Sequence, residues 1–172
     1  MTYPPVVIVD EKDKVVGEAM LADARAKGLI YRVVFVIASG PDGRVLLQKR
    51  SPQMQVYPNC WDISASGHVD DGHDYLEAAR LEMVEEIGVD KAPLTEVAHF
   101  FTDEPLWGGI ASKRYIKIFK TTIDTLPDTL GEDEVVAVQW FALQEIKQLV
   151  ADDPEGIAEG LRYSLPYILG EA

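Results

Sequence analysis

Residues 67–89 read GHVDDGHDYLEAARLEMVEEIGV, and this stretch decides the expected fold. It begins as an acidic loop and continues as a helix, because Asp74 and Glu77 have the spacing of a capping box and Gly88 is a suitable C-cap. At 100° per residue the apolar residues of this helix fall on one stripe, which predicts its buried face: Leu76, Ala79, Met83 and Ile87.

Three glutamates share the face beside that stripe. Glu82, Glu85 and Glu86 stand at positions i, i+3 and i+4. Carboxylates this close repel one another, which raises their pKa values unless a cation lies among them. A hard divalent ion with oxygen ligands, above all Mg²⁺, meets that need. The spacing alone leaves an alternative open, since glutamate pairs are common on solvated helix faces.

The sequence on both sides of this helix alternates between short strand-like and helical runs. Strands are expected at 6–9, 15–19, 32–38, 44–49, 94–101, 114–122 and 135–141, and further helices at 21–27, 143–150 and 155–169. Pro166 is expected to end or kink the last helix. Hairpins with interspersed helices predict an α/β protein with a mixed sheet between helical layers. One domain is expected over 1–172, with an extension at 1–29, a core at about 30–150 and the C-terminal helix.

The charge pattern excludes several classes of partner. The 172 residues include 16 Lys and Arg against 29 Asp and Glu, a net charge of −13. Such a chain lacks the basic excess that nucleic-acid polymers and anionic membranes require. The excess is concentrated, because residues 67–90 carry eight acids against Arg80 and residues 131–155 carry seven against Lys147. These two stretches together account for the whole net charge, which directs attention to cations.

Two further observations concern the cellular location. Cys60 is the single cysteine, so an intramolecular disulfide is impossible. No apolar run approaches ~18 residues, and the N-terminus lacks the pattern of a signal peptide. A cytoplasmic protein without a membrane partner is expected.

The stretch 67–89 resembles the Nudix box, G-x5-E-x7-R-E-U-x-E-E-x-G-U, in which U is an aliphatic residue. The residues in register are Gly67, Glu82, Met83, Glu85, Glu86, Gly88 and Val89. The resemblance extends to VVFVIASGPDGRVLLQKRS before the box, to WDISASGH leading into it and to GEDEVVAVQWFAL after it. It covers roughly residues 30–150 and implies the α/β/α sandwich of the Nudix family.

The resemblance also implies an activity. Nudix proteins bind Mg²⁺ or Mn²⁺ and hydrolyse a nucleoside diphosphate linked to another moiety. On this basis Glu82, Glu85, Glu86 and the backbone carbonyl of Gly67 are the expected metal ligands, and a metal-activated water attacks phosphorus. Glu85 and Glu86 are then catalytic. The expected substrates are small nucleoside di- or triphosphates or related conjugates, taken by a monomer or a homodimer.

Glu134 is the candidate general base. Some family members take this base from a loop after the box, and Glu134 ends the acidic run Gly131-Glu132-Asp133-Glu134 just before a predicted strand. A solvated acidic turn is the alternative interpretation of the same residues.

Two positions depart from the Nudix pattern. His73 stands where the box has Glu, and Leu81 where it has Arg. In the family these two positions commonly pair as a salt bridge that orients a catalytic glutamate. Because both partners are absent, no unpaired buried charge remains, and the helix is expected to survive. A non-catalytic nucleotide-binding Nudix domain is therefore an alternative.

A second alternative comes from a further resemblance. Residues 16–19, 28–32 and 58–62 are similar to the type 1 isopentenyl-diphosphate isomerases, which share the fold. Their acidic cysteine corresponds to Ser66 here, and of their histidine-rich metal site only His68 remains. The other ligand positions correspond to Ala24, Tyr31, Ser112 and Arg114. Isomerase activity is therefore the least expected of the three functions.

Residues at the end of the strand before the box are candidate substrate ligands. Lys49 and Arg50 could reach a phosphate chain, and arginine matches phosphate oxygens in a bidentate manner. Trp61 could stack on a base. The alternatives are an exposed strand end for the two cations and a core position for the aromatic ring.

Overall fold

The computed structural model describes residues 4–126 and 133–172, so Gly131 and Glu132 of the acidic run lie outside the described residues. The strands are β1 (Val6–Val9), β2 (Val15–Ala19), β3 (Ile30–Ser39), β4 (Val45–Arg50), β5 (Trp61–Asp62), β6 (Ala65–His68), β7 (Thr95–Thr102), β8 (Lys113–Thr122) and β9 (Val135–Phe141). The helices are α1 (Leu21–Ala26), α2 (Tyr75–Ile87), α3 (Leu143–Asp152) and α4 (Glu159–Leu169), with 3₁₀ turns η1 (Trp107–Gly109) and η2 (Pro154–Gly156).

Strand β3 is the centre of a mixed sheet. One edge pairs in parallel with β8 from Ile30 to Ser39, and β8 pairs antiparallel with β7. The other edge pairs antiparallel with β1, then β6, and finally, at Ser39 alone, with β4. Strand β4 also carries β5 and β9. The sheet therefore combines parallel and antiparallel pairs, as the sequence predicted.

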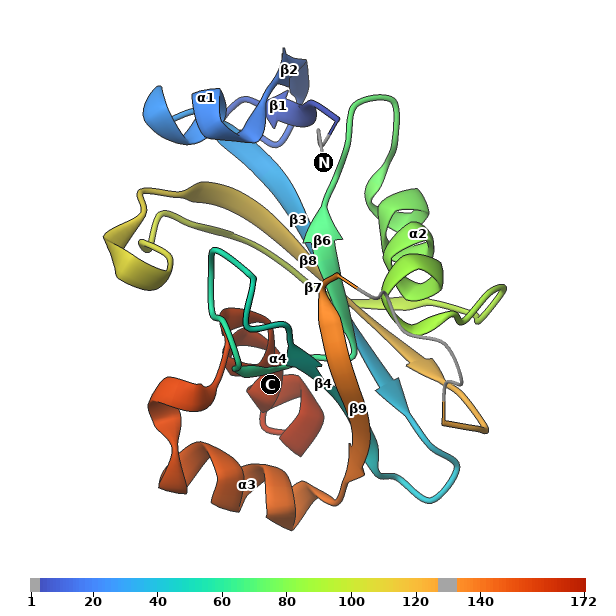
Figure 1. Cartoon of the computed structure of the whole chain (residues 1–172). Coiled ribbons are helices and arrows are strands. Elements are labelled where there is room, and N and C mark those ends of the chain that lie inside the picture. The colour runs from blue at the N-terminus through green and yellow to red at the C-terminus, as the bar shows by residue number, and fades with distance from the viewer. Residues whose placement is uncertain (1–3, 127–132) are drawn as a thin grey trace.

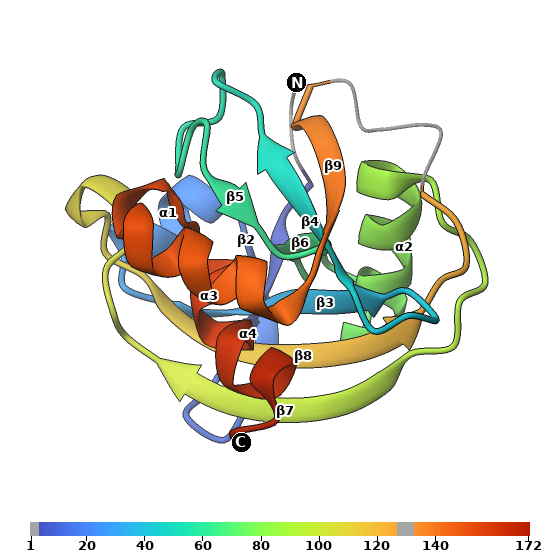
Figure 2. The same ribbon diagram turned by 90° about the horizontal axis from the view of Figure 1, so that it is seen from below.

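Helices cover both faces of this sheet (Figures 1 and 2). Side chains of β3 alternate between the faces, as the two-residue period of a strand requires. Val34, Val36 and Ala38 lie in a core cluster with α2. Tyr31, Val33, Phe35 and Ile37 lie in a second cluster with side chains of α1, α3 and α4. This is the expected α/β/α layering, and residues 33–38 of β3 are all buried because both faces are covered.

The predicted elements are found with shifted ends. The seven expected strands are present within two residues of their predicted bounds, whereas β5 and β6 had not been predicted because WDISASGH lacks a clear apolar alternation. The C-terminal helix begins at Glu159 rather than at residue 155, since η2 precedes it and Ile157 forms a bridge with Trp61. Pro166 does not end that helix, which continues to Leu169 with Ile168 buried in the core. Within the described ranges, no helix is both long and apolar enough to cross a membrane.

Candidate active site

Helix α2 is fixed at both ends by the residues that the sequence predicted. The Asp74 side chain accepts a hydrogen bond from the Glu77 backbone at 2.8 Å, and the Glu77 side chain accepts one from the Asp74 backbone at 2.8 Å. Gly88 closes the helix in the left-handed conformation, with φ 66°. The buried face differs from the predicted stripe in four places, because Leu76 is only half-buried while Tyr75, Ala78 and Glu86 are buried as well. The helix therefore turns one of its glutamates into the protein.

Glu86 is held in place inside the protein. Its side chain is 4% exposed, and its Oε2 atom accepts hydrogen bonds from Gln48 Nε2 at 2.9 Å and from the Ser66 backbone at 2.8 Å. Burial and then the charge of Glu134 raise the pKa of Glu86 to about 8, against the lowering effect of these hydrogen bonds and of the positive charge of Arg50. The protein thus fixes this carboxylate in an orientation where a cation would stabilise its ionised form.

Glu82 lies one turn earlier, against strand β6. Gly67, opposite Val34 in the β3–β6 ladder, has no side chain, and a Cβ atom there would overlap the Glu82 carboxylate. Burial raises the pKa of Glu82 well above its usual range, and the negative charges of Glu86 and Glu85 raise it further. The glycine of the box therefore makes room for one of its glutamates.

Glu134 and Glu85 complete this acidic cluster, which we define as Glu82, Glu85, Glu86 and Glu134. Glu134 is half-buried just before β9, and its charge raises the pKa of both Glu82 and Glu86. The Glu134 backbone carbonyl accepts a hydrogen bond from Ser51 at 2.7 Å, which fixes this segment beside the end of β4. Glu85 is exposed on α2. The structure thus brings the loop glutamate and the box glutamates together, although they lie about fifty residues apart in sequence.

The acidic cluster has the chemistry of a divalent-cation site. All its donors are oxygens, the ligands that Mg²⁺ and Mn²⁺ prefer. The buried Gln48 Oε1 atom, beside Glu86, has no hydrogen-bond partner within the described residues. In that same part of the chain, no three histidine, cysteine or carboxylate side chains are already placed to hold a metal ion. The donor types fit the ion, which would have to draw the glutamates together.

The sequence did not reveal that Gln48 and the backbone of Ser66 hold Glu86. Gln48 follows Leu46 by two residues in β4 and so lies on the same face, toward α2. A polar residue at a buried position of an apolar strand is the signal that could have identified it. The backbone N–H of Ser66 carries no signal in the sequence, because any non-proline residue supplies one.

The predicted substrate ligands lie at the joined ends of β4 and β5. Lys49 Nζ lies 5.1 Å from the centre of the Trp61 ring, which in turn packs edge-on against Phe141 at 5.0 Å. Arg50 Nη1 lies 3.2 Å from Asp62 Oδ2, and its Nη2 atom donates to the Val56 carbonyl at 3.1 Å. Lys49 and Trp61 are thus neighbours, while the guanidinium of Arg50 already braces the loop between these strands.

The two positions that depart from the box are exposed. Leu81 is 40% exposed, and His73 is exposed in the turn before α2, where its backbone donates to the Asp70 carbonyl at 3.1 Å. Losing a salt bridge between them therefore leaves no buried charge without a partner, and α2 is fully formed without it.

The isomerase-like positions are also brought together, on the opposite face of β6. Tyr31 Oη lies 2.6 Å from Ser112 Oγ, and the Tyr31 ring lies 5.6 Å from that of His68. Arg114 is buried and paired with Glu159. Two hydroxyls and a guanidinium occupy positions where the isomerase has metal ligands, so the arrangement gives no support to isomerase chemistry.

Comparisons of the sequence with known proteins lead to one family. A family model described as NUDIX domain matches residues 30–161. An uncharacterized Nudix hydrolase of Pseudomonas aeruginosa is 38% identical over 145 residues, covering 82% of this chain and 82% of its own length. The uncharacterized Nudix hydrolase YfcD of Escherichia coli is 30% identical over 142 residues, covering 81% of this chain and 74% of its own length.

Solved structures show the same fold. A protein of Deinococcus radiodurans superposes with a TM-score of 0.69 at 24% identity, covering 90% of this chain and 91% of its own. A MutT protein from Methanosarcina mazei superposes with a TM-score of 0.66 at 17% identity, covering 83% and 94% of the two chains.

Proposed function

The chain belongs to the Nudix family and is a hydrolase of phosphoanhydride bonds, and from that premise we propose that it is a Mg²⁺- or Mn²⁺-dependent pyrophosphohydrolase. Its substrates are small nucleoside di- or triphosphates or related nucleoside-diphosphate conjugates. The observation that carries the proposal is the acidic cluster, in which burial and neighbouring carboxylates raise the pKa values of both Glu82 and Glu86. A bound divalent ion would offset the repulsion among these carboxylates.

Each residue of the cluster has a distinct role in this proposal. Glu82, Glu85, Glu86 and the carbonyl of Gly67 would hold the ion. When bound, the ion would neutralise the charge of the phosphate oxygens and lower the pKa of the attacking water. Gln48 and the Ser66 backbone orient Glu86 through the hydrogen bonds to its Oε2 atom. Glu134, on its own segment, accepts the proton of the attacking water.

Substrate binding is assigned to the ends of β4 and β5. Lys49 lies over the ring of Trp61, so the two side chains present a cation and an aromatic face together. The cation would contact the phosphate chain and the ring would pack against the base. Arg50 would keep the intervening loop in place through Val56 and Asp62, and turn to phosphate only by giving up those contacts.

The test is a hydrolysis assay with the purified chain. A panel of nucleoside di- and triphosphates and nucleoside-diphosphate conjugates is incubated with Mg²⁺, with Mn²⁺ or with EDTA, and released phosphate, pyrophosphate and nucleotide are separated by anion-exchange chromatography. Turnover of at least one compound with either metal, abolished by EDTA, is expected. Turnover that persists in EDTA would contradict the metal assignment.

The departures from the Nudix box at His73 and Leu81 motivate one alternative, a nucleotide-binding domain without catalysis. Calorimetric titration of the same panel in Mg²⁺ distinguishes it from the hydrolase. Binding of a nucleotide without turnover of any compound would overturn the hydrolase proposal in favour of this alternative.

A further inference from the structure

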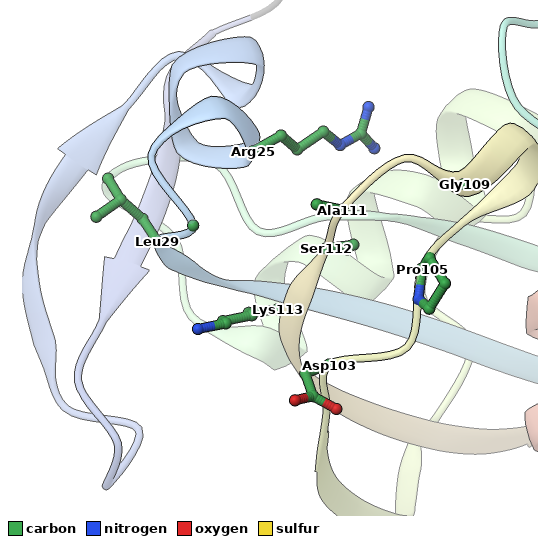
Figure 3. A pocket seen from close by; sticks show the side chains of 9 residues that line it. Arg25, Leu29, Asp103, Pro105, Gly109, Ala111, Ser112 and Lys113 are labelled. Carbon is green, nitrogen blue, oxygen red and sulfur yellow. The ribbon is translucent and has the colours of Figure 1, made fainter.

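A pocket of about 230 Å³ lies away from the acidic cluster, between α1, the segment that contains η1, and the start of β8 (Figure 3). Its polar lining comes from Arg25, Asp103, Ser112 and Lys113, and the rest is glycine, alanine, leucine and proline. Figure 3 shows the Arg25 side chain extending from α1 over the segment that carries Ala111 and Ser112. The lining thus holds two cationic side chains against one carboxylate.

Arg25 differs from the other partly or fully buried arginines of the same half of the molecule. Arg50 has Asp62 and Arg114 has Glu159 as ion-pair partners. Arg25 is half-buried, yet no carboxylate of the described residues lies within 4.0 Å of it, and its Nε atom makes one long contact, 3.4 Å, with Tyr31 Oη. A partly desolvated guanidinium without a counter-charge favours binding of an anion.

The floor of the pocket is rigid. Ser112 is buried, and its hydroxyl lies 2.6 Å from that of Tyr31, which has no exposed surface. Tyr31 pairs with Arg114 in the β3–β8 ladder, so the sheet itself holds these groups. Arg25 reaches the same Tyr31 hydroxyl, and Lys113 follows Ser112 directly. The Ser112 hydroxyl, which lines the pocket and is held by Tyr31, is therefore a preorganised contact for an anion oxygen and loses little entropy on binding.

We propose that this pocket binds a phosphate group of a small anionic ligand, with Arg25 as the principal contact and Lys113 and Ser112 as supporting contacts. The site does not depend on the hydrolase proposal, because Tyr31 belongs to the core cluster that faces α1 and α4, whereas the acidic cluster belongs to the α2 side. The bound phosphate belongs either to a nucleotide or to free inorganic phosphate, and the chemistry of recognition is the same for both.

The experiment is a titration of the protein in EDTA at constant ionic strength. Binding is monitored by calorimetry and by the chemical shifts of the backbone amides. The probes are inorganic phosphate and AMP. Saturable binding is expected, with shifts at residues 25, 112 and 113, and Arg25→Gln should weaken it by on the order of tenfold. Lys113→Gln, at an exposed position, should weaken it less. The matched control is Arg44→Gln, which removes an exposed arginine that pairs with Asp42 in the turn after β3.

The outcomes separate clearly. Tighter binding of AMP than of phosphate, with both sensitive to Arg25→Gln, assigns the pocket to a nucleotide, and equal binding assigns it to the free anion. No saturable binding of either probe would overturn the proposal. Binding that both variants leave unchanged, or shifts confined to residues 67 and 82–86, would overturn it as well. Lys113→Gln keeps the test decisive if Arg25→Gln does not fold.

Discussion

Gly67 and His68 are neighbours in β6 that face opposite sides of the sheet, and the two sides have opposite electrostatics. Gly67 faces Glu82, whose pKa is raised first by burial and then by the surrounding carboxylates. His68 lies beside Tyr31, and burial together with the positive charges of Arg25 and Arg114 lowers its pKa to about 3. One strand therefore separates a region of gathered carboxylates from a region where arginine charges act on a buried histidine.

The two regions differ in how far their charges are matched. On the basic side Arg114 and Arg50 have carboxylate partners, and Arg25 alone of the three has none among the described residues. On the acidic side no ion pair within 4.0 Å reaches Glu82, Glu85 or Glu86 from the described part of the chain. Like charges held together without partners cost stability, so they are typical of places where a ligand supplies the missing charge. The ion pairs of Arg50 with Asp62 and of Arg114 with Glu159, by contrast, hold elements of the fold together.

The strongest test of this contrast is Glu86→Gln. The amide keeps the shape of the side chain but removes the charge, so the rate of phosphoanhydride hydrolysis should fall by about a hundredfold or more. Above about pH 8, where Glu86 is ionised, the unfolding temperature of the metal-free protein should hold or rise, since a buried charge is lost. Steady-state kinetics in Mg²⁺ and calorimetric unfolding in EDTA measure the two effects.

The matched control for that variant is Glu155→Gln, at an exposed glutamate of η2. It should leave both the rate and the unfolding temperature unchanged. If the Glu86→Gln variant hydrolyses substrate as fast as the control, the charge of Glu86 has no part in catalysis. The gathering of carboxylates on this side of β6 would then have no catalytic role.

Gly67→Ala is the next largest change, and it tests the contact rather than the charge. The added methyl group would overlap the Glu82 carboxylate, so Glu82 must move, at a cost of about 1–3 kcal/mol in stability. The hydrolysis rate should fall by roughly tenfold, mainly through weaker binding of the metal. Titration of activity with Mg²⁺ measures that shift.

Gly17→Ala is the control, because nothing lies within 4 Å of a Cβ atom at Gly17, which is also in a strand. Its rate, metal dependence and stability should match those of the original protein to within about 0.5 kcal/mol. Equal behaviour of the two alanine variants would show that Glu82 does not need its place beside Gly67.

The pH dependence of stability sharpens the same comparison. Glu86 has a pKa of about 8 in the folded protein against 4.5 without its environment, so between these values the folded state keeps a proton that the unfolded state has released. The contribution of Glu86 to the free energy of unfolding of the metal-free protein is therefore fully present below pH 4.5 and is lost as the pH rises toward about 8. Unfolding temperatures from pH 5 to 9 should fall by a few degrees more for the original protein than for Glu86→Gln.

Mg²⁺ should reverse part of that loss at pH 8, because it binds the ionised carboxylates. The difference between the original protein and Glu86→Gln isolates this group from all others that titrate in the range. Parallel curves for the two proteins in EDTA would contradict the raised pKa of Glu86.

The sequence predicted the α/β/α layers and the acidic cluster better than the region around His68 and Arg25 on the other side of β6. The cap residues and glutamates of α2 lie in one continuous stretch, so their periodicity and spacing carry the information. The hydrogen bond from Gln48 to Glu86 and the contact of Tyr31 with Ser112 join residues 38 and 81 positions apart, and they depend on strand register. Register is fixed by the pairing of whole strands, which a local pattern does not reveal.

The smallest expected effect concerns the positions where the chain departs from the Nudix box. The double variant with His73→Glu and Leu81→Arg restores the pair common in the family. Both positions are exposed here, and an exposed ion pair contributes about 0–1 kcal/mol, so the hydrolysis rate should change by less than about fivefold. Leu81→Arg alone separates the effect of the charge from that of the pair. A hundredfold rise in the hydrolysis rate of the double variant would contradict this expectation. An exposed ion pair can raise the rate that much only by realigning the glutamates of the acidic cluster, so such a rise would show that they are misaligned in the natural chain.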